Sequence, residues 1–399
     1  MILLLALPSR LTWSSPAEPL VRTPGLADLG WTASEAARYS GHDILLLQQG
    51  AVRLALDRQN ARGGIPGVRF VTGLLVVPAT IETVRARLHR PLSRVWGDDF
   101  HIDIAQWRSA AGQATYQEEQ SYPLPIGHWH VRLLMRQTDI DAYSWQRQLI
   151  QGPLTASISR YELFAVDSQH TLIVLTHWSR IDADTWFYRL LLRAQPQIGS
   201  ALPWMVVAST LEATRRQFAR WPGTTDTPYL DGALRIHAPT ARQAALQWVS
   251  LDADLKVDAA TALQRLGEVD RYPEFLHMLR QVRIESRGGG IQLTRWQLQI
   301  DLGLWHIRKQ AWLYLQKTPD SLHLWLPPGP TGERMEAYWQ ISAAGPTLSH
   351  TRLSIASQGL SLGWMLGVLR YSPYPQIDEP LIASRLIVLR GRRWLLHTH

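Results

Sequence analysis

The sequence predicts an α+β protein made of two copies of one domain, each a curved antiparallel sheet wrapped around a long helix that ends the copy. Three observations carry this prediction. The chain repeats itself at an offset of about 180 residues, and each copy has the order strand, short helix, run of strands, long helix. Its 399 residues, with 46% hydrophobic and 19% charged side chains, are enough for two domains that bury cores.

Four matched segments define the repeat. They occur in the same order in both copies at offsets of 176 to 182 residues, a small drift that loops of different length would cause. Gly50–Leu54 returns as Gly232–Ile236, Ile126–Arg132 as Leu302–Arg308, Gly152–Pro153 as Gly329–Pro330, and Pro196–Ile198 as Pro375–Ile377. A run rich in proline, glycine and threonine separates the copies. We therefore predict a first domain over residues 24–221, a linker over 222–231 and a second domain over 232–399.

The second copy shows the order of elements most clearly. Residues 246–257 alternate as a strand does, and Asp258 can cap a helix over 259–266. Six strand-length runs bounded by Gly, Pro or Ser follow, which predicts an antiparallel sheet with a turn at Gly288–Gly290. They cover 282–285, 293–302, 304–316, 322–326, 335–341 and 348–357. A helical stretch comes last, broken at 372–375 and resuming over 379–393.

The first copy repeats this order. A strand is expected over 68–77, and a helix over 78–88 with Pro78 in its first turn, where a proline is tolerated. Strands follow between about residues 102 and 181, and a helix over 200–220 ends the copy.

Residues 1–23 form a signal or lead-in segment in this interpretation. Met1–Leu7 is an apolar stretch at the short limit of a signal-peptide core, and Ser15–Ala17 offers small residues for cleavage, although no positive residues come first. We therefore favour a periplasmic or secreted location over a cytoplasmic one. No run of eighteen apolar residues occurs, so no transmembrane helix is expected.

Cysteine content and charge narrow the chemistry. The absence of cysteine excludes disulfides, thiolate metal sites and a cysteine nucleophile. The net charge of +8 favours anionic surfaces and is compatible with peripheral contact with an anionic membrane. The basic residues are spread along the chain, and the one dense cluster, Arg390, Arg392 and Arg393, lies at an expected helix end. We therefore do not predict nucleic-acid binding.

One segment of the second copy resembles a known family. Asp270–Leu276, with the sequence DRYPEFL, resembles the D-x-Y-P-x-F-(L/V) segment of bacterial START-type helix-grip domains. This SRPBCC superfamily includes coenzyme Q-binding proteins and polyketide cyclase/dehydrases. The first copy has Arg90–Trp96 at that place, so its membership rests on the repeat. The resemblance implies a hydrophobic cavity between sheet and long helix, in a family of lipid, sterol and quinone carriers with a minority of enzymes.

The 18 tryptophans and the strand alternation indicate where such a cavity would lie. Trp296, Leu298 and Ile300 share one face of their strand, and Trp305 with Ile307 continues an apolar face after Gly303. The predicted cavity residues are these five with Tyr272 and Phe275 of the motif and Leu381 and Leu389 of the last helix. For any one of these tryptophans, ordinary core packing is the competing interpretation.

A serine motif deserves a separate test. Gly359–Gly363 fits the G-x-S-x-G nucleophile elbow around Ser361, and Asp378 and His397 follow in the order found in hydrolases. The elbow needs a parallel strand–turn–helix, whereas the preceding strand closes an antiparallel run, and the first copy has no counterpart. We interpret the motif as accidental, with glycines that ease the passage into the last helix.

Other polar groups are expected to have structural roles. His128 and His130 share a strand face, but a third zinc ligand is not evident, and we expect the shared histidine, His130 or His306, to be hydrogen-bonded within the sheet. The adjacent pairs Asp98-Asp99 and Glu118-Glu119 point apart and are expected to be solvated, Gly288–Gly290 lacks the Lys-Ser/Thr of a phosphate loop, and His397 and His399 belong to a tail. No catalytic residue, metal or cofactor is assigned.

The leading functional hypothesis is non-catalytic binding, or transport, of a hydrophobic small molecule such as a lipid or isoprenoid quinone. Two alternatives stay open: an enzyme of the polyketide cyclase/dehydrase type, and a scaffolding module with a vestigial cavity. A cyclase should have ionisable residues on its inward faces, whereas the inward faces assigned from the sequence carry Trp, Leu and Ile. Binding therefore leads.

Overall fold

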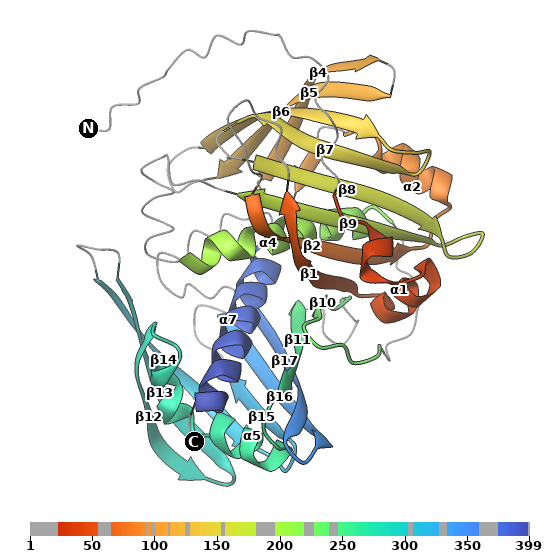
Figure 1. Cartoon of the computed structure of the whole chain (residues 1–399). Helices are drawn as coiled ribbons and strands as arrows, with labels where there is room; N and C mark the ends of the chain where they lie inside the picture. The colour runs from red at the N-terminus through yellow and green to blue at the C-terminus, as the bar shows by residue number, and fades with distance from the viewer. Residues whose placement is uncertain are drawn as a thin grey trace, which may run out of the picture.

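A computed structural model describes residues 23–54, 65–91, 94–96, 100–110, 112–123, 128–152, 156–180, 196–218, 227–238, 246–301, 306–326, 333–358 and 374–397 (Figure 1). Within these ranges the strands form one 17-stranded sheet, and every strand pair is antiparallel. Among the described helices, none is long and apolar enough to cross a membrane.

The chain up to residue 218, here called the first half, contains a 3₁₀ turn, helices and nine strands. Its elements are η1 (Leu26–Leu29), α1 (Ala33–Ser40), β1 (Ile44–Leu54), β2 (Ile65–Val77), α2 (Ile81–Leu88), β3 (Arg94–Trp96), β4 (Phe100–Ala110), β5 (Gln113–Pro123), β6 (His128–Asp139), β7 (Ser144–Gln151), β8 (Ala156–Ala165), β9 (Thr171–Arg180) and α4 (Pro196–Arg215).

The chain from residue 227 onward, here called the second half, follows the same order without a counterpart of α1. Its elements are β10 (Leu234–Ile236), β11 (Trp248–Leu255), α5 (Ala259–Leu266), η3 (Val269–Glu274), β12 (Leu279–Gly288), β13 (Ile291–Asp301), β14 (His306–Lys317), β15 (Ser321–Trp325), β16 (Arg334–Gly345), β17 (Leu348–Gln358) and α7 (Pro375–His397).

The two halves repeat one element order, as predicted. The strand, short helix, six strands and long helix of the first half (β2, α2, β4 to β9, α4) correspond to β11, α5, β12 to β17 and α7. The elements α5, β13 and β14 begin 178 residues after α2, β5 and β6. Two matched segments are wrong. Gly50 lies within β1, whereas Gly232 lies in the turn before β10 with φ of 78°. His306 begins β14 as His128 begins β6, so the match of His130 with His306 is off by two residues.

Strand pairing gives one continuous order across both halves. From edge to edge the strands are β3, β4, β5, β6, β7, β8, β9, β2, β1, β10, β11, β17, β16, β15, β14, β13 and β12. The strand before each short helix, β2 or β11, therefore pairs with the last strand of its own half. The halves are joined edge to edge through β1 and β10, a contact that the sequence did not predict.

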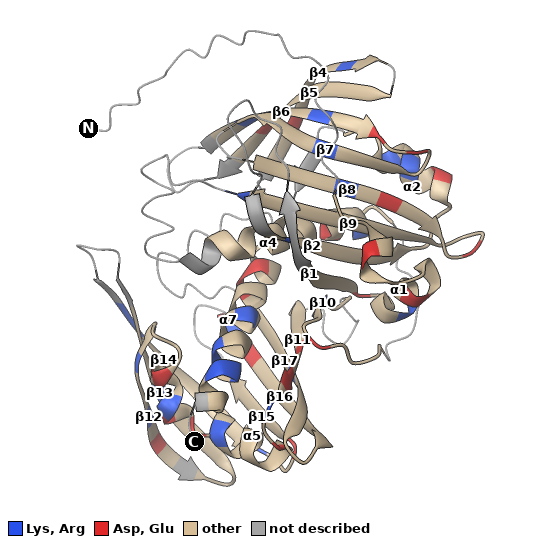
Figure 2. Ribbon diagram, in the orientation of Figure 1, with Lys and Arg blue, Asp and Glu red and all other residues tan. Residues whose placement is uncertain are grey.

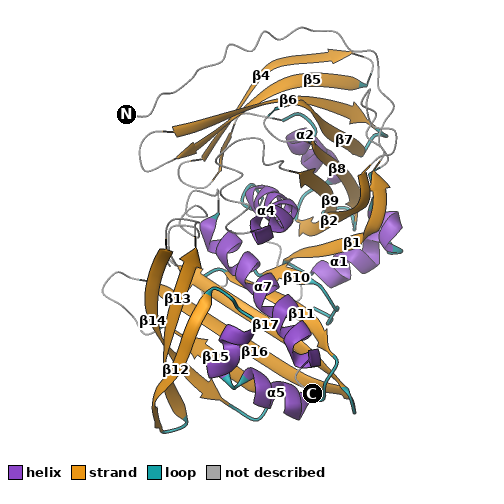
Figure 3. Cartoon of the chain, turned by 60° about the vertical axis from the view of Figure 1, so that its left-hand side comes forward, coloured by secondary structure: helices purple, strands orange, loops and turns teal. Residues whose placement is uncertain are grey.

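Figure 3 shows the two long helices, α4 and α7, lying against the sheet. Helix α4 packs on β2 and β9, α7 packs on β11 and β17, and the two helices also touch each other. Both begin at a proline, four residues earlier than the sequence predicted, because a first-turn proline costs no intrahelical bond. Helix α2 begins at Ile81 after an N-cap at Thr80, so Pro78 lies before the helix and its predicted first-turn position is wrong.

Other local predictions hold to the residue. Helix α5 spans Ala259–Leu266, and the side chain of Asp258 accepts a hydrogen bond from the Thr261 N–H, as an N-cap should. Gly289 and Gly290 have φ of 56° and 78° in the turn between β12 and β13, a conformation that glycine adopts without strain. Helix α1 was missed, although Thr32 and Glu35 form a capping box that the sequence contains.

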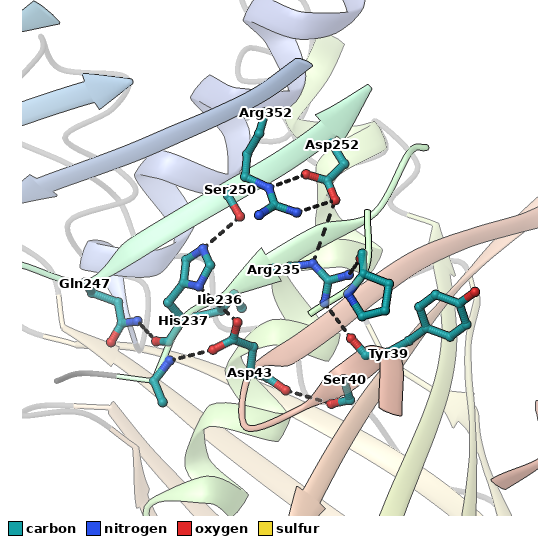
Figure 4. A network of polar contacts seen from close by, with 12 residues as sticks. Tyr39, Ser40, Asp43, Arg235, Ile236, His237, Gln247, Ser250, Asp252 and Arg352 are labelled. Carbon is teal, nitrogen blue, oxygen red and sulfur yellow. Dashed lines mark hydrogen bonds and ion pairs between the residues drawn. The ribbon is translucent and has the colours of Figure 1, made fainter. Parts of the chain in front are cut away.

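Polar side chains form hydrogen bonds and ion pairs across the junction between the halves (Figure 4). Arg235 lies opposite Leu45 in the β1–β10 pair and is fully buried, and it donates to the backbone carbonyls of Tyr39 at 2.6 Å and Pro228 at 2.7 Å. Across the pair, Asp43 accepts from the Ala238 N–H at 3.0 Å and lies 2.9 Å from His237 Nδ1. Burial alone would raise the pKa of Asp43, but these contacts hold it below its usual range. The junction is thus a specific contact.

Candidate functional site

The inward face of the second half, which α7 covers, contains most of the predicted cavity residues. Tyr272, Phe275, Trp296, Leu298 and Leu381 are all buried within one hydrophobic cluster. The Tyr272 ring meets the Trp296 ring edge-on at 5.6 Å between centroids. The strand parity that placed Trp296 and Leu298 together on the inner face is therefore correct.

The polar atoms of these aromatic residues are used inside the protein. The Tyr272 hydroxyl donates to the Leu266 carbonyl at 2.8 Å, at the end of α5, and burial raises its pKa. Trp296 Nε1 donates to Thr294 Oγ1 at 2.8 Å, and Trp394 Nε1 donates to Glu274 at 2.8 Å. The inward face offers apolar contact from these rings, with their hydrogen-bonding groups already satisfied.

The D-x-Y-P-x-F segment is mainly a structural joint. Tyr272 ties η3 to α5, and Phe275 stacks on Trp394 of α7 at 5.1 Å between ring centroids. A Cβ at Gly391 would lie 3.7 Å from the Phe275 ring, an ordinary van der Waals contact, so α7 lies next to the segment here. The motif therefore sets where the long helix lies, which explains why it indicates fold better than function.

For the other four predicted cavity residues, the structure describes the side chain of Leu389 alone. Leu389 is 49% exposed, so it does not close the inward face, and its predicted role is wrong. It follows Leu381 by eight residues, a little more than two turns, and the helix has turned it to the outside. Trp305 lies outside the described residues, as do the side chains of Ile300 and Ile307.

The rejected motifs can be placed in part. Ser361 with its flanking glycines, Asp98-Asp99 and His399 lie outside the described residues. Glu119 pairs with Arg132 at 2.9 Å and with His130 Nδ1 at 3.3 Å, so His130 has a carboxylate neighbour in the sheet. Strand pairing sets His128 opposite Pro123 and His306 opposite Asp301, which makes His128 the counterpart of His306. Among the described residues, no group of three or more His, Asp or Glu could hold a metal ion.

The inward face of the first half is different because it contains ionisable side chains. Arg147, Ser159 and His177 are neighbours on β7, β8 and β9. The equivalent neighbours in the second half are Leu324, Ala337 and Ile355. Sequence analysis missed this polar row. β9 is buried at nine of its ten positions, so its sequence shows no alternation from which the inner face could be identified.

Arg147 uses its guanidinium to hold the end of α2. It donates to the carbonyls of Leu88 at 2.6 Å and His89 at 3.1 Å and to Gln137 Oε1 at 3.0 Å. Its Cζ lies 4.8 Å from the ring centroid of Tyr161, which stacks on Trp145 at 5.1 Å. Burial tends to lower the pKa of Arg147, but the nearby tyrosines raise it, so the side chain stays charged.

His177 is buried and pairs with the partly buried Ser159. The Ser159 hydroxyl lies 2.8 Å from His177 Nδ1, and Nε2 has no hydrogen-bond partner in the described part of the chain. Burial lowers the pKa of His177 to about 3. The imidazole is therefore neutral near pH 7 and can exchange hydrogen bonds, but it is far from the pKa that suits a general base at that pH.

Several aromatic side chains lie on the outer face of the second half, between inward residues of the same strands. His323 stacks on Tyr338 at 3.9 Å and on Trp325 at 4.4 Å between ring centroids, and Trp325 meets Tyr314 at 5.3 Å. Trp312 continues the row and is 41% exposed. Part of the tryptophan content thus forms cross-strand stacks rather than an interior.

No family model matches the chain, and no curated protein sequence matches it. Solved structures do match. The di-domain ARO/CYC BexL from the BE-7585A biosynthetic pathway is 11% identical, with 82% of this chain and 97% of that chain covered and a TM-score of 0.29. The di-domain ARO/CYC StfQ from the steffimycin biosynthetic pathway is 12% identical, with 81% and 96% covered and a TM-score of 0.29. The human StarD13 lipid transfer and protein localization domain is 10% identical, with 49% and 98% covered and a TM-score of 0.34.

Each half has the order of elements that the resemblance of Asp270–Leu276 implied. Each half contains a strand, a short helix, six antiparallel strands and a long helix on the sheet. The likenesses to solved structures, at these identities and TM-scores, carry no conclusion about ligand or reaction.

Proposed function

We propose that the protein binds a hydrophobic small molecule, a lipid or an isoprenoid quinone, without transforming it. It is built from two tandem helix-grip domains, residues 24–221 and 232–399, joined by a linker over 222–231. The second domain holds the ligand between its inward face and α7. Peripheral contact with an anionic membrane belongs to the same proposal, and the exposed Leu389 beside Arg390 on α7 supports it.

One observation carries the proposal: the inward face of the second half is apolar where that of the first half is polar. Leu324, Ala337 and Ile355 occupy the row of positions that holds Arg147, Ser159 and His177 in the first half. Burying apolar ligand surface against such a face is favourable by roughly 25 cal/mol for each Å². A polar ligand would lose its hydrogen bonds to water there without replacing them.

Two matched leucine variants test the proposal. Leu298 in the second half and Leu163 in the first half are both inward and buried. Either Leu→Ala change should lower the free energy of unfolding by about 2–5 kcal/mol. Leu298→Ala should also weaken uptake of a fluorescent lipid or quinone analogue by more than about tenfold, whereas Leu163→Ala should leave the uptake by folded protein unchanged.

Uptake and thermal unfolding are measured on the same samples, below the unfolding temperature of each variant. Organic extraction of the purified protein, followed by mass spectrometry, identifies the natural ligand. No uptake by the wild-type protein, or an equal loss in both variants, would contradict the proposal.

A second function has specific support in the first half. An enzyme of the polyketide cyclase/dehydrase type needs ionisable groups on an inward face, and Arg147, Tyr161 and His177 are such groups. The low pKa of His177 and the backbone bonds of Arg147 make them poorly suited to proton transfer, which is why binding leads. Cyclisation of a linear poly-β-keto thioester by the wild-type protein, abolished in Tyr161→Phe, would make this second function the correct one.

A further inference from the structure

An arginine lies at the contact between the two long helices, where the halves meet. Arg385 of α7 is partly buried, and its Cζ lies 3.8 Å from the ring centroid of Trp204 on α4. Figure 2 shows that α7 has several basic residues, and Figure 3 shows α4 and α7 side by side. The stacking covers one side of the guanidinium plane and leaves its N–H groups directed along the plane.

Arg385 has no hydrogen bond or ion pair with the residues that the structure describes. The other enclosed arginines of the chain do have acceptors: Arg147 bonds two carbonyls, Arg235 bonds two carbonyls, and Arg352 forms a two-point contact with Asp252 at 2.6 and 3.0 Å. Buried charges in proteins are normally paired. Arg385 is only partly buried and its nitrogens are not among the fully enclosed atoms, so its guanidinium is accessible to an acceptor from outside the protein.

The indole of the neighbouring Trp204 also lacks a hydrogen-bond partner in the described part of the chain. Trp204 is 3% exposed, and its Nε1 has no acceptor in the described part of the chain. The guanidinium carbon lies 3.8 Å from the centroid of this ring, so both groups belong to the same contact between α4 and α7. Both groups donate and neither accepts, so the missing partner is a hydrogen-bond acceptor with negative charge.

The surroundings are apolar. Ile382 is 8% exposed, Leu386 and Met205 pack against the main core cluster, and Leu389 follows one turn later with 49% of its surface exposed. Burial lowers the pKa of Arg385 to about 10, and the side chain remains charged near pH 7. An acceptor at this place would meet a cation on one side and hydrocarbon on the other.

We propose that Arg385 and Trp204 form a site for the oxyanion of an amphipathic ligand, a carboxylate or a phosphate monoester attached to an apolar chain. The Arg385 N–H groups and Trp204 Nε1–H donate to the oxyanion, and the chain lies along the apolar surface of α7 that includes Leu386 and Leu389. The site lies between the halves and not on the inward face of the second half. It therefore stands or falls separately from the proposed function.

The test uses three probes with the same chain: dodecanoate, dodecyl phosphate and dodecanol, each below its critical micelle concentration. Calorimetric titration of the full chain should show one of the two anions binding at least about tenfold tighter than dodecanol, because a charge-assisted hydrogen bond contributes about 1.5–3 kcal/mol. The tighter anion tells whether the ligand is a carboxylate or a phosphate monoester.

Variants then assign the preference to named residues. Arg385→Gln should remove the preference for the anion while leaving dodecanol binding unchanged, and Arg385→Lys, which keeps the charge, should retain part of it. Trp204→Phe, which keeps the ring and removes the N–H, should weaken anion binding a few-fold. Arg393→Gln, at an exposed arginine of the same helix, is the matched control and should behave like the wild type.

Two results would overturn the proposal. One is equal affinity of the wild-type protein for the anions and dodecanol. The other is a preference that survives Arg385→Gln or disappears equally in Arg393→Gln, since either outcome would mean that general positive charge attracts the anion. A loss of uptake in Leu298→Ala with the anion preference intact would show that the two sites are separate.

Discussion

The two halves share one fold but differ in the chemistry of their inward faces. At one row of cross-strand neighbours the first half has Arg147, Ser159 and His177, and the second half has Leu324, Ala337 and Ile355. The backbone register is the same in both rows. The repeat therefore conserves the sheet and the long helix, while the residues of this inward row differ at all three positions.

The helices also approach their sheets differently. In the first half, a Cβ at Gly73 would lie 2.3 Å from Val207 and 2.5 Å from Leu211, so α4 rests directly on the backbone of β2. The equivalent position in the second half, on β11 opposite Leu353, holds Leu251. The first half thus has a glycine beneath its long helix where the second half has a leucine side chain. Function must be assigned to each half separately.

The largest expected effect concerns acid stability. His177 has a pKa of about 3 in the folded protein and about 6.5 when unfolded, so the unfolded chain binds the extra proton first as the pH falls. Stability should be full above pH 6.5 and should decrease by about 1.4 kcal/mol per pH unit below it, or about 5 kcal/mol by pH 3. Urea unfolding measured from pH 7 to pH 4 tests this.

The control is His177→Ile, which copies the second half. The variant should have a flatter pH dependence over the same range, because no imidazole is left to protonate. An unchanged slope in this variant would mean that other groups cause the acid sensitivity and that the polar row has no such consequence.

Arg147→Leu, which copies Leu324, should lower the free energy of unfolding by about 3 kcal/mol at pH 7. The reason is that the carbonyls of Leu88 and His89 and the side chain of Gln137 lose their charged donor within the core. Arg132→Leu is the comparison, since its side chain is 71% exposed and its ion pair with Glu119 should contribute at most about 1 kcal/mol. Equal effects of the two changes in denaturant unfolding would contradict the structural role of Arg147.

Gly73→Ala should destabilise the protein by about 1–3 kcal/mol, because the added methyl group must displace Val207 and Leu211 of α4. Gly288→Ala serves as a control, since a Cβ there meets nothing within 4 Å. Thermal unfolding of both variants measures the difference. A Gly73→Ala variant as stable as the wild type would mean that α4 can shift away from its sheet at little cost in free energy.

Helices and strands were predicted correctly where the sequence has a clear hydrophobic period or a clear helix cap. Asp258 and the apolar spacing after it located α5 to the residue, and Gly288–Gly290 located a hairpin turn. The polar row was missed because Arg147 lies on the same face of β7 as Trp145. In a sequence, a charged residue normally indicates a solvent-facing position, so the pattern did not identify this face as the inward one. Leu389 was misplaced because the apolar residues of α7 surround the helix, so spacing alone did not tell its inner face from its outer face.

The junction could not have been predicted from local patterns. The pairing of Leu45 with Arg235 joins residues 190 positions apart, and it depends on a buried arginine satisfied by the carbonyls of Tyr39 and Pro228. Pattern reasoning assigns a buried position to apolar residues and gives no partner for a charged one. The same limit applies to Arg385, whose importance became visible only when its stacking on Trp204 was known.

The smallest expected effect belongs to Ser361, which lies outside the described residues. Ser361→Ala should leave ester hydrolysis, ligand uptake and stability unchanged, the last within about 0.5 kcal/mol. A nucleophile elbow needs a parallel strand before the serine, whereas β17, the last described strand before it, pairs antiparallel with both β11 and β16. Hydrolysis of a p-nitrophenyl ester and uptake of the quinone analogue are measured on folded variant and wild type. If hydrolysis were lost with the fold intact, the second half would be catalytic, and the comparison of a polar first half with a purely binding second half would fail.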